Sequence, residues 1–252
     1  MNEFYRDKVA LVTGGGTGIG RAAAEAFASA GARVVVAGRS EAACADTTTA
    51  IRAKGGTALS ISCDVADENQ VMRLCERITT EMGDVDVAFL NAGVGSGSAI
   101  VNQDVDTFRM VMAVNCTGLM LCLKHLLRKM YARKAGAIVT NLSVHAHRTI
   151  LEGTVAYTAS KHAAWAITKL AAIESAVHGV RVNAVSPGPI HTDMLARSSN
   201  ESGGMNTWAE RLPIKRVGLP HEVADAVLWL CSPSASFING AAIPIDGGYM
   251  AL

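Results

Sequence analysis

The sequence predicts an α/β fold in which a doubly wound, seven-stranded parallel sheet carries helices on both faces. Short apolar segments rich in Val, Ile and Ala alternate along the chain with helical segments of about 10 to 30 residues, a pattern typical of repeated β-α-β units. A glycine-rich turn also joins the first strand to the first long helix. The expected strands cover residues 8–12, 33–37, 58–63, 85–90, 136–141, 180–185 and 241–245.

The helices between these strands are predicted from apolar periodicity and from the residues that end them. The Ala-rich segment 21–30 follows the glycine turn, and segment 41–54 ends at a Gly-Gly pair. Asp67 is expected to cap the next helix, because its carboxylate can accept hydrogen bonds from backbone N–H groups of the first turn. The remaining helices are expected at 67–82, 104–133, 157–177 and 222–231.

Length and composition indicate a single domain over residues 1–252. A chain of this length can bury one large core, and no Pro- or Ser-rich linker, charge run or internal repeat divides it. It carries 23 Lys and Arg against 22 Asp and Glu, a formal net charge of +1. This balance argues against nucleic acid or an anionic membrane surface as a partner.

The N-terminus and the cysteines favour a cytoplasmic protein. Residues 1–8 are polar and charged, unlike a secretory signal. The most apolar helical stretch, 157–177, contains lysine, histidine and glutamate, so we expect no membrane span. The six cysteines form no Cys-x-x-Cys pair and are expected to be buried, reduced thiols. His145 and His147 have no acidic or cysteine partners nearby in the sequence, so we expect no metal site.

The strongest local motif follows the first strand, where Thr13-Gly14-Gly15-Gly16-Thr17-Gly18-Ile19-Gly20 leads into a helix. A strand, a glycine turn and a helix form a phosphate cradle, because backbone N–H groups at the helix N-terminus face the anion and the missing side chains let it approach. The spacing is Thr-Gly-x-x-x-Gly-x-Gly, not the Gly-x-Gly-x-x-Gly of the common dinucleotide fingerprint. The alternative is a turn that needs glycine only for positive φ angles.

The end of the second strand bears on the choice of dinucleotide. Folds that select NAD place an Asp or Glu roughly 20 residues after the glycines, where it binds the adenosine ribose. This chain has Gly38 instead, followed by Arg39, whose guanidinium can bind a 2′-phosphate. We therefore expect NADP(H) to be favoured, with NAD(H) as the alternative. In that alternative Arg39 stacks on adenine or faces solvent.

Tyr157 and Lys161 are predicted to form an acid–base pair. On a helix they would lie one turn apart, with Cβ atoms roughly 6 Å from each other. A free tyrosine titrates near pH 10, and a positive charge within about 4–6 Å lowers that pKa. Tyr157 could then donate and accept a proton near neutral pH. Alone, Tyr-x-x-x-Lys is a weak motif, since amphipathic helices contain it by chance.

The positions of other polar residues strengthen this interpretation. In doubly wound sheets, ligands bind outside the carboxyl ends of the strands. Asn115 lies inside an apolar helical run, where it would be costly to bury without hydrogen-bond partners, so we expect its side chain to have them. The residues that fall at strand ends are Gly14, Arg39, Asp64, Asn91, Ser143 and Pro187.

The motifs also form an ordered set. It consists of Thr13-Gly14-x-x-x-Gly18-Ile19-Gly20, Asn91-Ala92-Gly93, Asn115, Ser143, Tyr157-x-x-x-Lys161 and Pro187-Gly188. This set resembles the short-chain dehydrogenase/reductase family over residues 8–252. It looks most like the compact subgroup that includes 3-oxoacyl-carrier-protein reductases, glucose dehydrogenases and cyclic alcohol dehydrogenases. The resemblance implies a Rossmann-type fold and an NAD(P)(H)-dependent oxidoreductase, which transfers a hydride between the nicotinamide and a secondary alcohol or ketone.

The resemblance implies a role for each site residue. Tyr157 would be the acid/base, and Ser143 would hydrogen-bond the substrate oxygen. Lys161 would lower the pKa of Tyr157 and hold the nicotinamide ribose, while Asn115 would position a water that joins Lys161 to solvent. The other cofactor contacts are expected from Gly14, Thr17, Gly18, Ile19 and Gly20 at the pyrophosphate, Asp64 and Val65 at the adenine, Asn91, Ala92 and Gly93 along the cofactor, and Pro187, Gly188, Ile190 and Thr192 beside the nicotinamide.

Substrate specificity is expected to reside in two segments. Residues 190–215 would form a substrate lid, because apolar side chains on a Gly- and Ser-rich loop can cover an uncharged substrate. The alternative for this segment is an ordinary loop with two short helices packed on the core. Residues 144–155 match no substrate-specific pattern, and their polar members either face the substrate or lie at the surface. These members are His145, His147, Arg148 and Glu152.

The resemblance also implies a homotetramer. It would be built through the helix at 111–133 and the helix that begins at Tyr157, whose small residues offer close-packing faces. The small residues in question are Ala159, Ala163, Ala164, Ala166, Ala171 and Ala172.

Two other functions fit the sequence less well. Extended relatives epimerise or dehydrate nucleotide sugars, but the glycine spacing and the compact length of this chain argue against that group. A catalytically silent dinucleotide-binding regulatory protein would be expected to lack Tyr157, Lys161 or Ser143, and all three are present.

Overall fold

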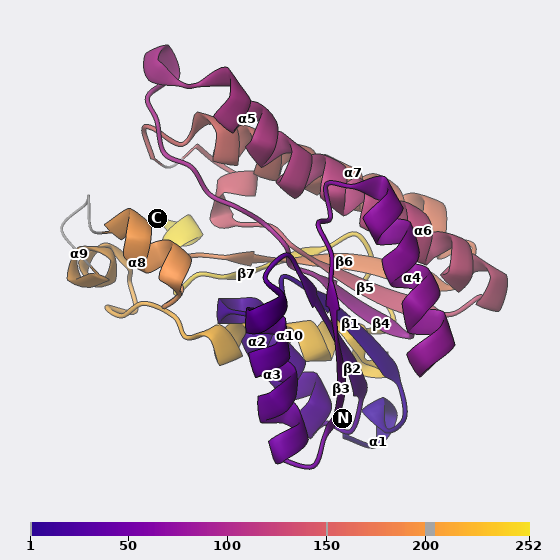
Figure 1. The fold of residues 1–252 in the computed structure, drawn as a ribbon. Helices are drawn as coiled ribbons and strands as arrows, with labels where there is room; N and C mark the ends of the chain where they lie inside the picture. Colours follow the sequence, from indigo (N-terminus) through magenta and orange to yellow (C-terminus); the bar gives the residue numbers. More distant parts are fainter. Residues whose placement is uncertain (1, 150, 200–204) are drawn as a thin grey trace.

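A seven-stranded parallel sheet forms the centre of the molecule (Figure 1). The structure is a computed structural model that describes residues 2–149, 151–199 and 205–252. The strand order is β3-β2-β1-β4-β5-β6-β7, and every neighbouring pair is parallel. This confirms the predicted doubly wound α/β fold. The strands are β1 (Val9–Thr13), β2 (Arg33–Gly38), β3 (Thr57–Ser62), β4 (Val87–Leu90), β5 (Gly136–Asn141), β6 (Val180–Pro187) and β7 (Ala242–Ile245).

The long helices lie where the sequence predicts them, apart from shifts of a few residues at their ends. Asp67 caps α4 as expected, since its Oδ1 accepts hydrogen bonds from the backbone nitrogens of Asn69 and Gln70 at 2.9 and 3.1 Å. A short N-terminal helix, α1 (Asn2–Tyr5), was not predicted. The long helices are α2 (Gly18–Ser29), α3 (Glu41–Ala53), α4 (Glu68–Met82), α5 (Val105–Met112), α6 (Gly118–Arg133), α7 (Val155–Ala176) and α10 (Pro220–Cys231).

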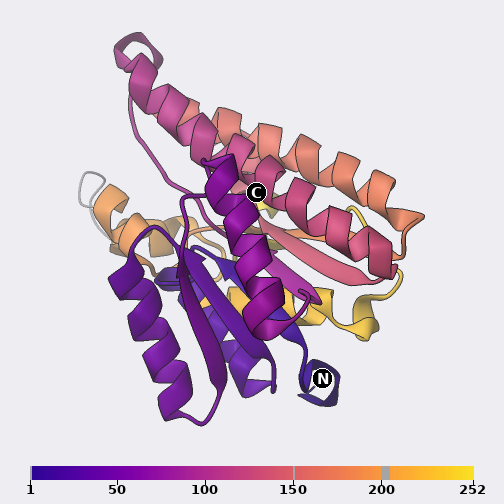
Figure 2. The same cartoon turned by 45° about the vertical axis from the view of Figure 1, so that its right-hand side comes forward.

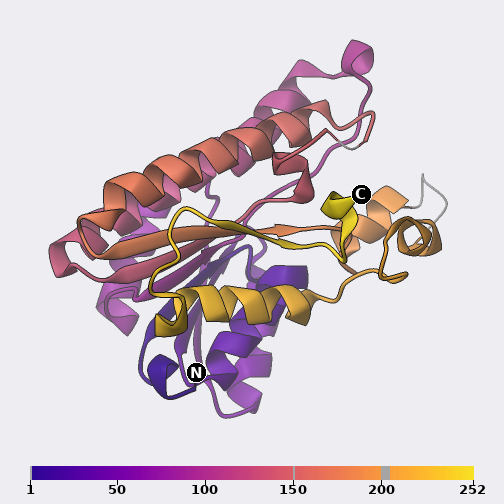
Figure 3. The ribbon, with the colours of Figure 1, turned by 180° about the vertical axis from the view of Figure 1, so that it is seen from behind.

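Helices cover both faces of the sheet. Helices α4, α6 and α7 lie on one face, and α2, α3 and α10 lie on the other (Figures 1 and 2). Seen from behind, α10 runs along the second face below the long β6 strand (Figure 3). The C-terminus lies beside the short helices α8 (Asp193–Ser199) and α9 (Met205–Arg211) (Figures 1 and 3).

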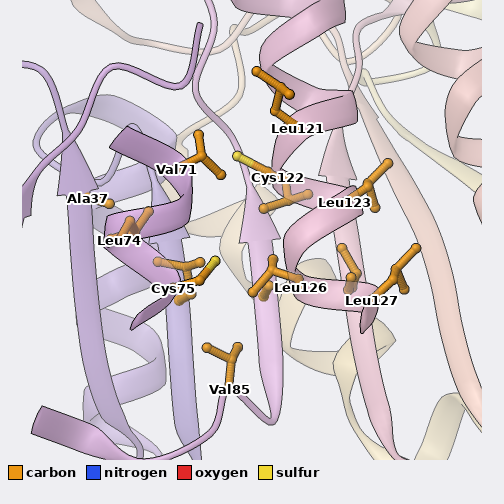
Figure 4. Close-up of a cluster of buried hydrophobic side chains, with 14 of the residues drawn as sticks. Ala37, Val71, Leu74, Cys75, Val85, Leu121, Cys122, Leu123, Leu126 and Leu127 are labelled. Atoms are coloured by element: carbon orange, nitrogen blue, oxygen red, sulfur yellow. The ribbon is translucent and has the colours of Figure 1, made fainter. Parts of the chain in front are cut away.

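Apolar side chains at helical spacing hold α4 and α6 against the sheet. Val71 and Cys75 of α4 point towards Cys122 and Leu126 of α6 above the strands (Figure 4). These four side chains are at most 5% exposed. Fully burying one such leucine contributes roughly 1.5–3 kcal/mol, so this layer rigidly supports the loops at the strand ends.

The sheet order creates a crevice between β1 and β4. From β1 the chain continues to β2 and β3 on one side, whereas β4 to β7 extend on the other. At such a switch point the loops after the two central strands diverge, and ligands bind between them. Gly14 follows β1 and Asn91 follows β4. The predicted site residues therefore converge at one edge of the sheet.

The six cysteines are free, as the sequence predicts; five of them are buried, whereas Cys116 is only half-buried, so the prediction that all six are buried is wrong for Cys116. Burial raises the pKa of the Cys75 thiol to about 11, so this group is an inert part of the core.

One helical stretch, Val105–Arg133, has the length and composition of a membrane span, but half of it is buried within the protein. Because its buried residues belong to the core cluster of α4 and α6, we interpret it as a core helix.

Candidate active site

The glycine turn between β1 and α2 has the geometry of a phosphate cradle. Gly14 and Gly18 have φ angles of 62° and 53°, which favour glycine. A Cβ on Gly20 would lie 2.1 Å from the carbonyl oxygen of Gly14, so no side chain fits there. Thr17 precedes α2 and its side chain makes no capping hydrogen bond. Because the first N–H groups of a helix have no intrahelical partners, this turn presents free donors to an anion such as a pyrophosphate.

Asn91 holds the glycine turn in place. Its Nδ2 donates to the carbonyl oxygens of Thr13 and Gly14 at 3.1 and 3.0 Å, and its Oδ1 accepts from Nδ2 of Asn141 at 2.8 Å. The backbone nitrogens of Asn91 and Ala92 both donate to Oγ1 of Thr13, at 3.0 and 3.1 Å. The side chain of Asn91 is thus a clamp between β1, β4 and β5. Sequence analysis placed Thr13 in the glycine motif without giving its side chain a role, and it missed Asn141, although both are polar residues that end buried strands.

The loops after β2 and β3 border the region expected to hold the adenosine. Arg39 is exposed and, among the residues that the structure describes, has no hydrogen-bond or ion-pair partner. A Cβ on Gly38 would lie 3.1 Å from Sγ of Cys44, so an acidic side chain there would need a local shift.

In the loop after β3, Val65 is 5% exposed and packs towards Gly118 of α6, so its side chain belongs to the core. Asp64 uses Oδ1 to accept from the backbone nitrogen of Ala66 at 3.0 Å.

Asn115 lies on a π-helical turn, Ala113–Thr117, that separates α5 from α6. Its Oδ1 accepts from the backbone nitrogen of Val94 at 2.8 Å, and its Nδ2 donates to the Val94 carbonyl at 2.8 Å and to Oγ of Ser160 at 3.0 Å. The side chain is 3% exposed. The structure confirms that this buried Asn has partners. They tie the loop after β4 to α7.

Tyr157, Ser143 and Lys161 meet beyond the carboxyl end of β5. The side chain of Ser143 lies close enough to the hydroxyl of Tyr157 to act on it as a hydrogen-bond donor. One turn along α7, Nζ of Lys161 lies 5.6 Å from the centroid of the Tyr157 ring and donates to the carbonyl oxygen of Asn141 at 2.7 Å. Lys161 is 4% exposed, and a Cβ on Gly93 would lie 3.7 Å from its Nζ. The loop after β4 therefore passes directly over the ammonium group.

The electrostatics of this cluster differ in one respect from the expectation. The pKa of Tyr157 is raised above its usual value, because burial disfavours the phenolate, while the hydrogen bond from Ser143 lowers it. The net lowering of the Tyr157 pKa that the sequence predicts is therefore wrong, and Lys161 is not among the groups that shift it. Burial lowers the pKa of Lys161 itself to about 8, so the ammonium group is still mostly charged at pH 7 and loses its proton just above neutral pH.

The loop after β6 borders the other side of the crevice. The strand ends at Pro187, and a Cβ on Gly188 would lie 2.9 Å from Cα of Asp246, which leaves no room for a side chain. Ile190 is buried and pairs with Gly218 in an isolated bridge. Cγ2 of Thr192 would lie 3.2 Å from a Cβ on Gly18.

The predicted lid contains two short helices, α8 and α9; residues 200–204 of the lid lie outside the described residues. Sδ of Met194 in α8 lies 3.8 Å from the position of a Cβ on Gly95, so α8 reaches across to the loop after β4. Trp208 and Leu212 are 8% and 1% exposed and are packed inward. The segment thus combines a helix over the crevice with an anchored second half.

The polar residues of the loop after β5 have separate environments. Nδ1 of His145 lies 3.0 Å from Oγ1 of Thr158, whereas Nε2 of His147 lies 2.7 Å from Oγ of Ser186. Arg148 donates to the carbonyl oxygen of Leu252 at 2.9 Å. Of the two histidines, His145 is the one whose ring contacts Tyr157, edge to face with centroids 5.5 Å apart. Within the described ranges, no group of three His, Cys, Asp or Glu residues could hold a metal ion.

Comparisons with known proteins show to which family the chain belongs. A family model described as enoyl-(acyl carrier protein) reductase matches residues 14–250. The cis-4-hydroxycyclohexanecarboxylate dehydrogenase of Sinomonas cyclohexanicum is 40% identical over 253 residues, which cover 100% of both chains. A short-chain type dehydrogenase/reductase from Mycobacterium marinum has a TM-score of 0.94 at 36% identity, covering 98% of this chain and 97% of that one. The chain belongs to the short-chain dehydrogenase/reductase family.

Membership of this family shows which class of reaction the chain catalyses. The chain is an NAD(P)(H)-dependent oxidoreductase that acts on alcohol or ketone groups. Another similar structure is a variant of actinorhodin polyketide ketoreductase with NADPH, at a TM-score of 0.93 and 30% identity, covering 99% of this chain and 98% of that chain. Nothing in these relatives supports the alternative of a catalytically silent regulatory protein.

Proposed function

We propose that this short-chain dehydrogenase/reductase interconverts a ring-borne secondary alcohol and its ketone, with Tyr157 as the acid/base and NADP(H) as the favoured cofactor. The observation that carries the proposal is the contact of the Tyr157 hydroxyl with Ser143, with Nζ of Lys161 5.6 Å from the ring. A proton carrier, a donor for the substrate oxygen and a cation are thus gathered at the mouth of the crevice.

The roles of the three residues follow from their chemistry. In alcohol oxidation Tyr157 accepts the hydroxyl proton, and in ketone reduction it returns the proton to the developing alkoxide. Ser143 hydrogen-bonds the same substrate oxygen and stabilises the charge that develops there. The bound nicotinamide accepts or supplies the hydride. Lys161, with one hydrogen bond fixed on Asn141, has donors left for the ribose hydroxyls of the cofactor.

Asn115 acts through its position on the π-helical turn. Val94 and Ser160 use both donors of its Nδ2 and one of the two lone pairs of its Oδ1, so a water that it holds would bind the other lone pair or its backbone carbonyl. Asn115, Asn141 and Lys161 line a cavity of about 10 Å³, close to the space that one water needs. A water there would connect Lys161 to solvent and allow the proton on Tyr157 to be exchanged.

The preference for NADP(H) rests on Arg39. Its guanidinium is exposed at the end of β2, and no acidic residue stands at position 38 to repel a 2′-phosphate. A charge-assisted hydrogen bond from arginine to phosphate is stronger than one between neutral groups. The NADPH in the similar ketoreductase structure supports this preference. The expected contacts along the cofactor are Gly14, Thr17, Gly18, Ile19, Gly20, Asp64, Val65, Asn91, Ala92, Gly93, Pro187, Gly188, Ile190 and Thr192.

The proposed substrate class is a cyclic secondary alcohol or ketone. The similar dehydrogenase from Sinomonas cyclohexanicum is named for a hydroxylated cyclohexane ring. In this chain α8 brings the apolar side chain of Met194, which is 41% exposed, next to the loop that contains Gly95. An apolar cover of this kind suits a ring and excludes water during hydride transfer.

We also propose a cytoplasmic homotetramer. The outward face of α7 exposes Leu170, Ile173 and Val177 to 58%, 71% and 85%, a stripe of apolar residues at helical spacing. A second copy packing on this face would bury them. Three of the alanines expected at the interface are instead buried within the chain, namely Ala164, Ala171 and Ala172. Light scattering should give the mass of four chains, and the mass of one chain would contradict the assembly.

A substrate screen tests the function directly. Absorbance at 340 nm is followed with a panel of cyclic and acyclic alcohols and ketones, each with NADP(H) and NAD(H). The proposal expects turnover of cyclic secondary alcohols or ketones, faster with the phosphorylated cofactor. Tight NADPH binding without turnover of any compound would refute it.

A further inference from the structure

A chain of hydrogen bonds beside Tyr157 fixes the protonation of His145. The hydroxyl of Thr154 donates to the carbonyl oxygen of Leu151 at 2.9 Å. A hydroxyl has only one proton to donate, and that of Thr154 is already used. In the 3.0 Å contact between the hydroxyls of Thr154 and Thr158, Thr158 must therefore donate and Thr154 must accept. The proton of Thr158 is then used as well. In the 3.0 Å contact between Thr158 and Nδ1 of His145, the proton must come from the imidazole.

This arrangement leaves Nε2 of His145 as a bare acceptor. Burial lowers the pKa of His145, and the nearby His162 lowers it further, so the ring is neutral near pH 7. A neutral imidazole with a proton on Nδ1 has a lone pair on Nε2. Among the described residues Nε2 has no hydrogen-bond partner, and His145 as a whole is 9% exposed.

The position of the ring places this acceptor beside the reacting groups. The backbone nitrogen of His145 donates to Oγ of Ser143 at 3.2 Å. Its ring lies edge to face on the ring of Tyr157, with centroids 5.5 Å apart. His145 is thus joined to both residues that would contact the substrate oxygen.

We propose that His145 is a specificity-determining residue that accepts a hydrogen bond from a second hydroxyl group of the substrate. This inference rests on the proposed function and adds that the substrate is a cyclic diol or hydroxyketone. A lone pair at Nε2 attracts a hydroxyl proton but repels a carboxylate or a second carbonyl oxygen. When a substrate lacks the hydroxyl, the acceptor is left without a partner in the closed site, which costs affinity.

A matched pair of substrates tests the assignment. The ratio of kcat/KM for cyclohexane-1,2-, 1,3- or 1,4-diol to that for cyclohexanol is measured in the wild type and in His145→Phe. Phenylalanine keeps an aromatic edge against Tyr157 but removes the acceptor. One neutral hydrogen bond corresponds to roughly 3- to 10-fold in kcat/KM. We expect the wild type to prefer one diol over cyclohexanol and His145→Phe to lose that preference, mainly through KM.

Controls separate binding from packing. His178→Phe changes a histidine that stacks on Tyr131 at 3.9 Å, remote from Tyr157, and should leave the ratio unchanged. A ratio that His145→Phe also leaves unchanged would overturn the inference while the proposed function stands. If the wild type oxidises neither cyclohexanol nor any diol with either cofactor, the proposed function fails first.

A spectroscopic measurement stands independently of activity and of how His145→Phe folds. Nitrogen-15 NMR of the wild-type protein with labelled histidine should show the His145 ring neutral, with the proton on Nδ1 and none on Nε2. Thr158→Val, which removes the acceptor of that proton, should change the tautomer. A wild-type ring with its proton on Nε2, or a doubly protonated ring at pH 7, would overturn the proposal.

Discussion

Replacing Asn115 with alanine should destabilise the fold and loosen the cofactor loop at once. The change removes three hydrogen bonds from a side chain that is 3% exposed. At about 0.5–1.5 kcal/mol for each bond, the free energy of unfolding should fall by roughly 2–4 kcal/mol. For a chain of this size, that corresponds to a fall in Tm of roughly 5–15 °C.

The same variant should weaken cofactor binding. Both backbone groups of Val94 lose their partner, and the neighbouring Gly93 would border the cofactor. Calorimetric melting and NADPH titration monitored by fluorescence measure the two effects. Cys116→Ala is the control, because Cys116 lies on the same π-helical turn without a hydrogen bond among the described residues. An Asn115→Ala protein with the Tm and Kd of the wild type would refute the reasoning.

Three further substitutions test the cofactor site and the acid/base. Arg39→Ala should weaken NADPH binding by about 10-fold or more, with little change for NADH, because a charge-assisted bond contributes roughly 1.5–3 kcal/mol; titration with both cofactors measures this. Gly20→Ala should abolish cofactor binding, since its Cβ would lie 2.1 Å from a carbonyl oxygen. Ser143→Ala should move the ascending limb of kcat/KM for alcohol oxidation to higher pH. The substitution removes the hydrogen-bond donor that lowers the pKa of Tyr157, so this pKa rises. Because alcohol oxidation needs the deprotonated tyrosine, a higher pH is then required for the same rate.

Each of these has a control or a contrary outcome. Arg128→Ala changes another exposed arginine, on α6, and should leave both cofactor affinities unaltered. If Arg39→Ala lowers the affinities for NADPH and NADH equally, Arg39 does not bind the 2′-phosphate. Gly95→Ala should be tolerated, because the nearest atom to its Cβ would be 3.8 Å away. A pH limb in Ser143→Ala that stays in place or moves to lower pH would contradict the assigned hydrogen bond.

Local sequence patterns were enough to predict the fold. Each predicted strand exists because a short apolar run bounded by polar or glycine residues is stable mainly within a buried parallel sheet. The N-cap at Asp67 and the buried partners of Asn115 were also predictable, since an unpaired polar group in these places would be costly. The exact pairing of Asn115 with Val94 was not, because it depends on a π-helical turn and on packing between segments distant in the sequence.

The sequence predicted that Ser143, Tyr157 and Lys161 lie close together, but it did not predict their electrostatics. Sequence spacing places Tyr157 and Lys161 on one helix face but does not reveal how strongly the surrounding fold desolvates them, and this desolvation raises the pKa of Tyr157 instead of lowering it. Asn91 was expected to line the cofactor, and the structure adds that its side chain clamps the glycine turn, which no sequence pattern indicated. The tautomer of His145 depends on two threonine hydroxyls, which no sequence motif records.

The most direct test of the central claim is the rate of Tyr157→Phe. The substitution removes one hydroxyl, bonded to Ser143, and keeps the ring that packs beside Lys161. Loss of a general acid/base should lower kcat by about 100- to 10,000-fold, while the Kd for NADPH, measured by titration, stays within about twofold of the wild type because the ring still packs as before. A variant that oxidises the same alcohol at the wild-type rate would show that another group moves the proton.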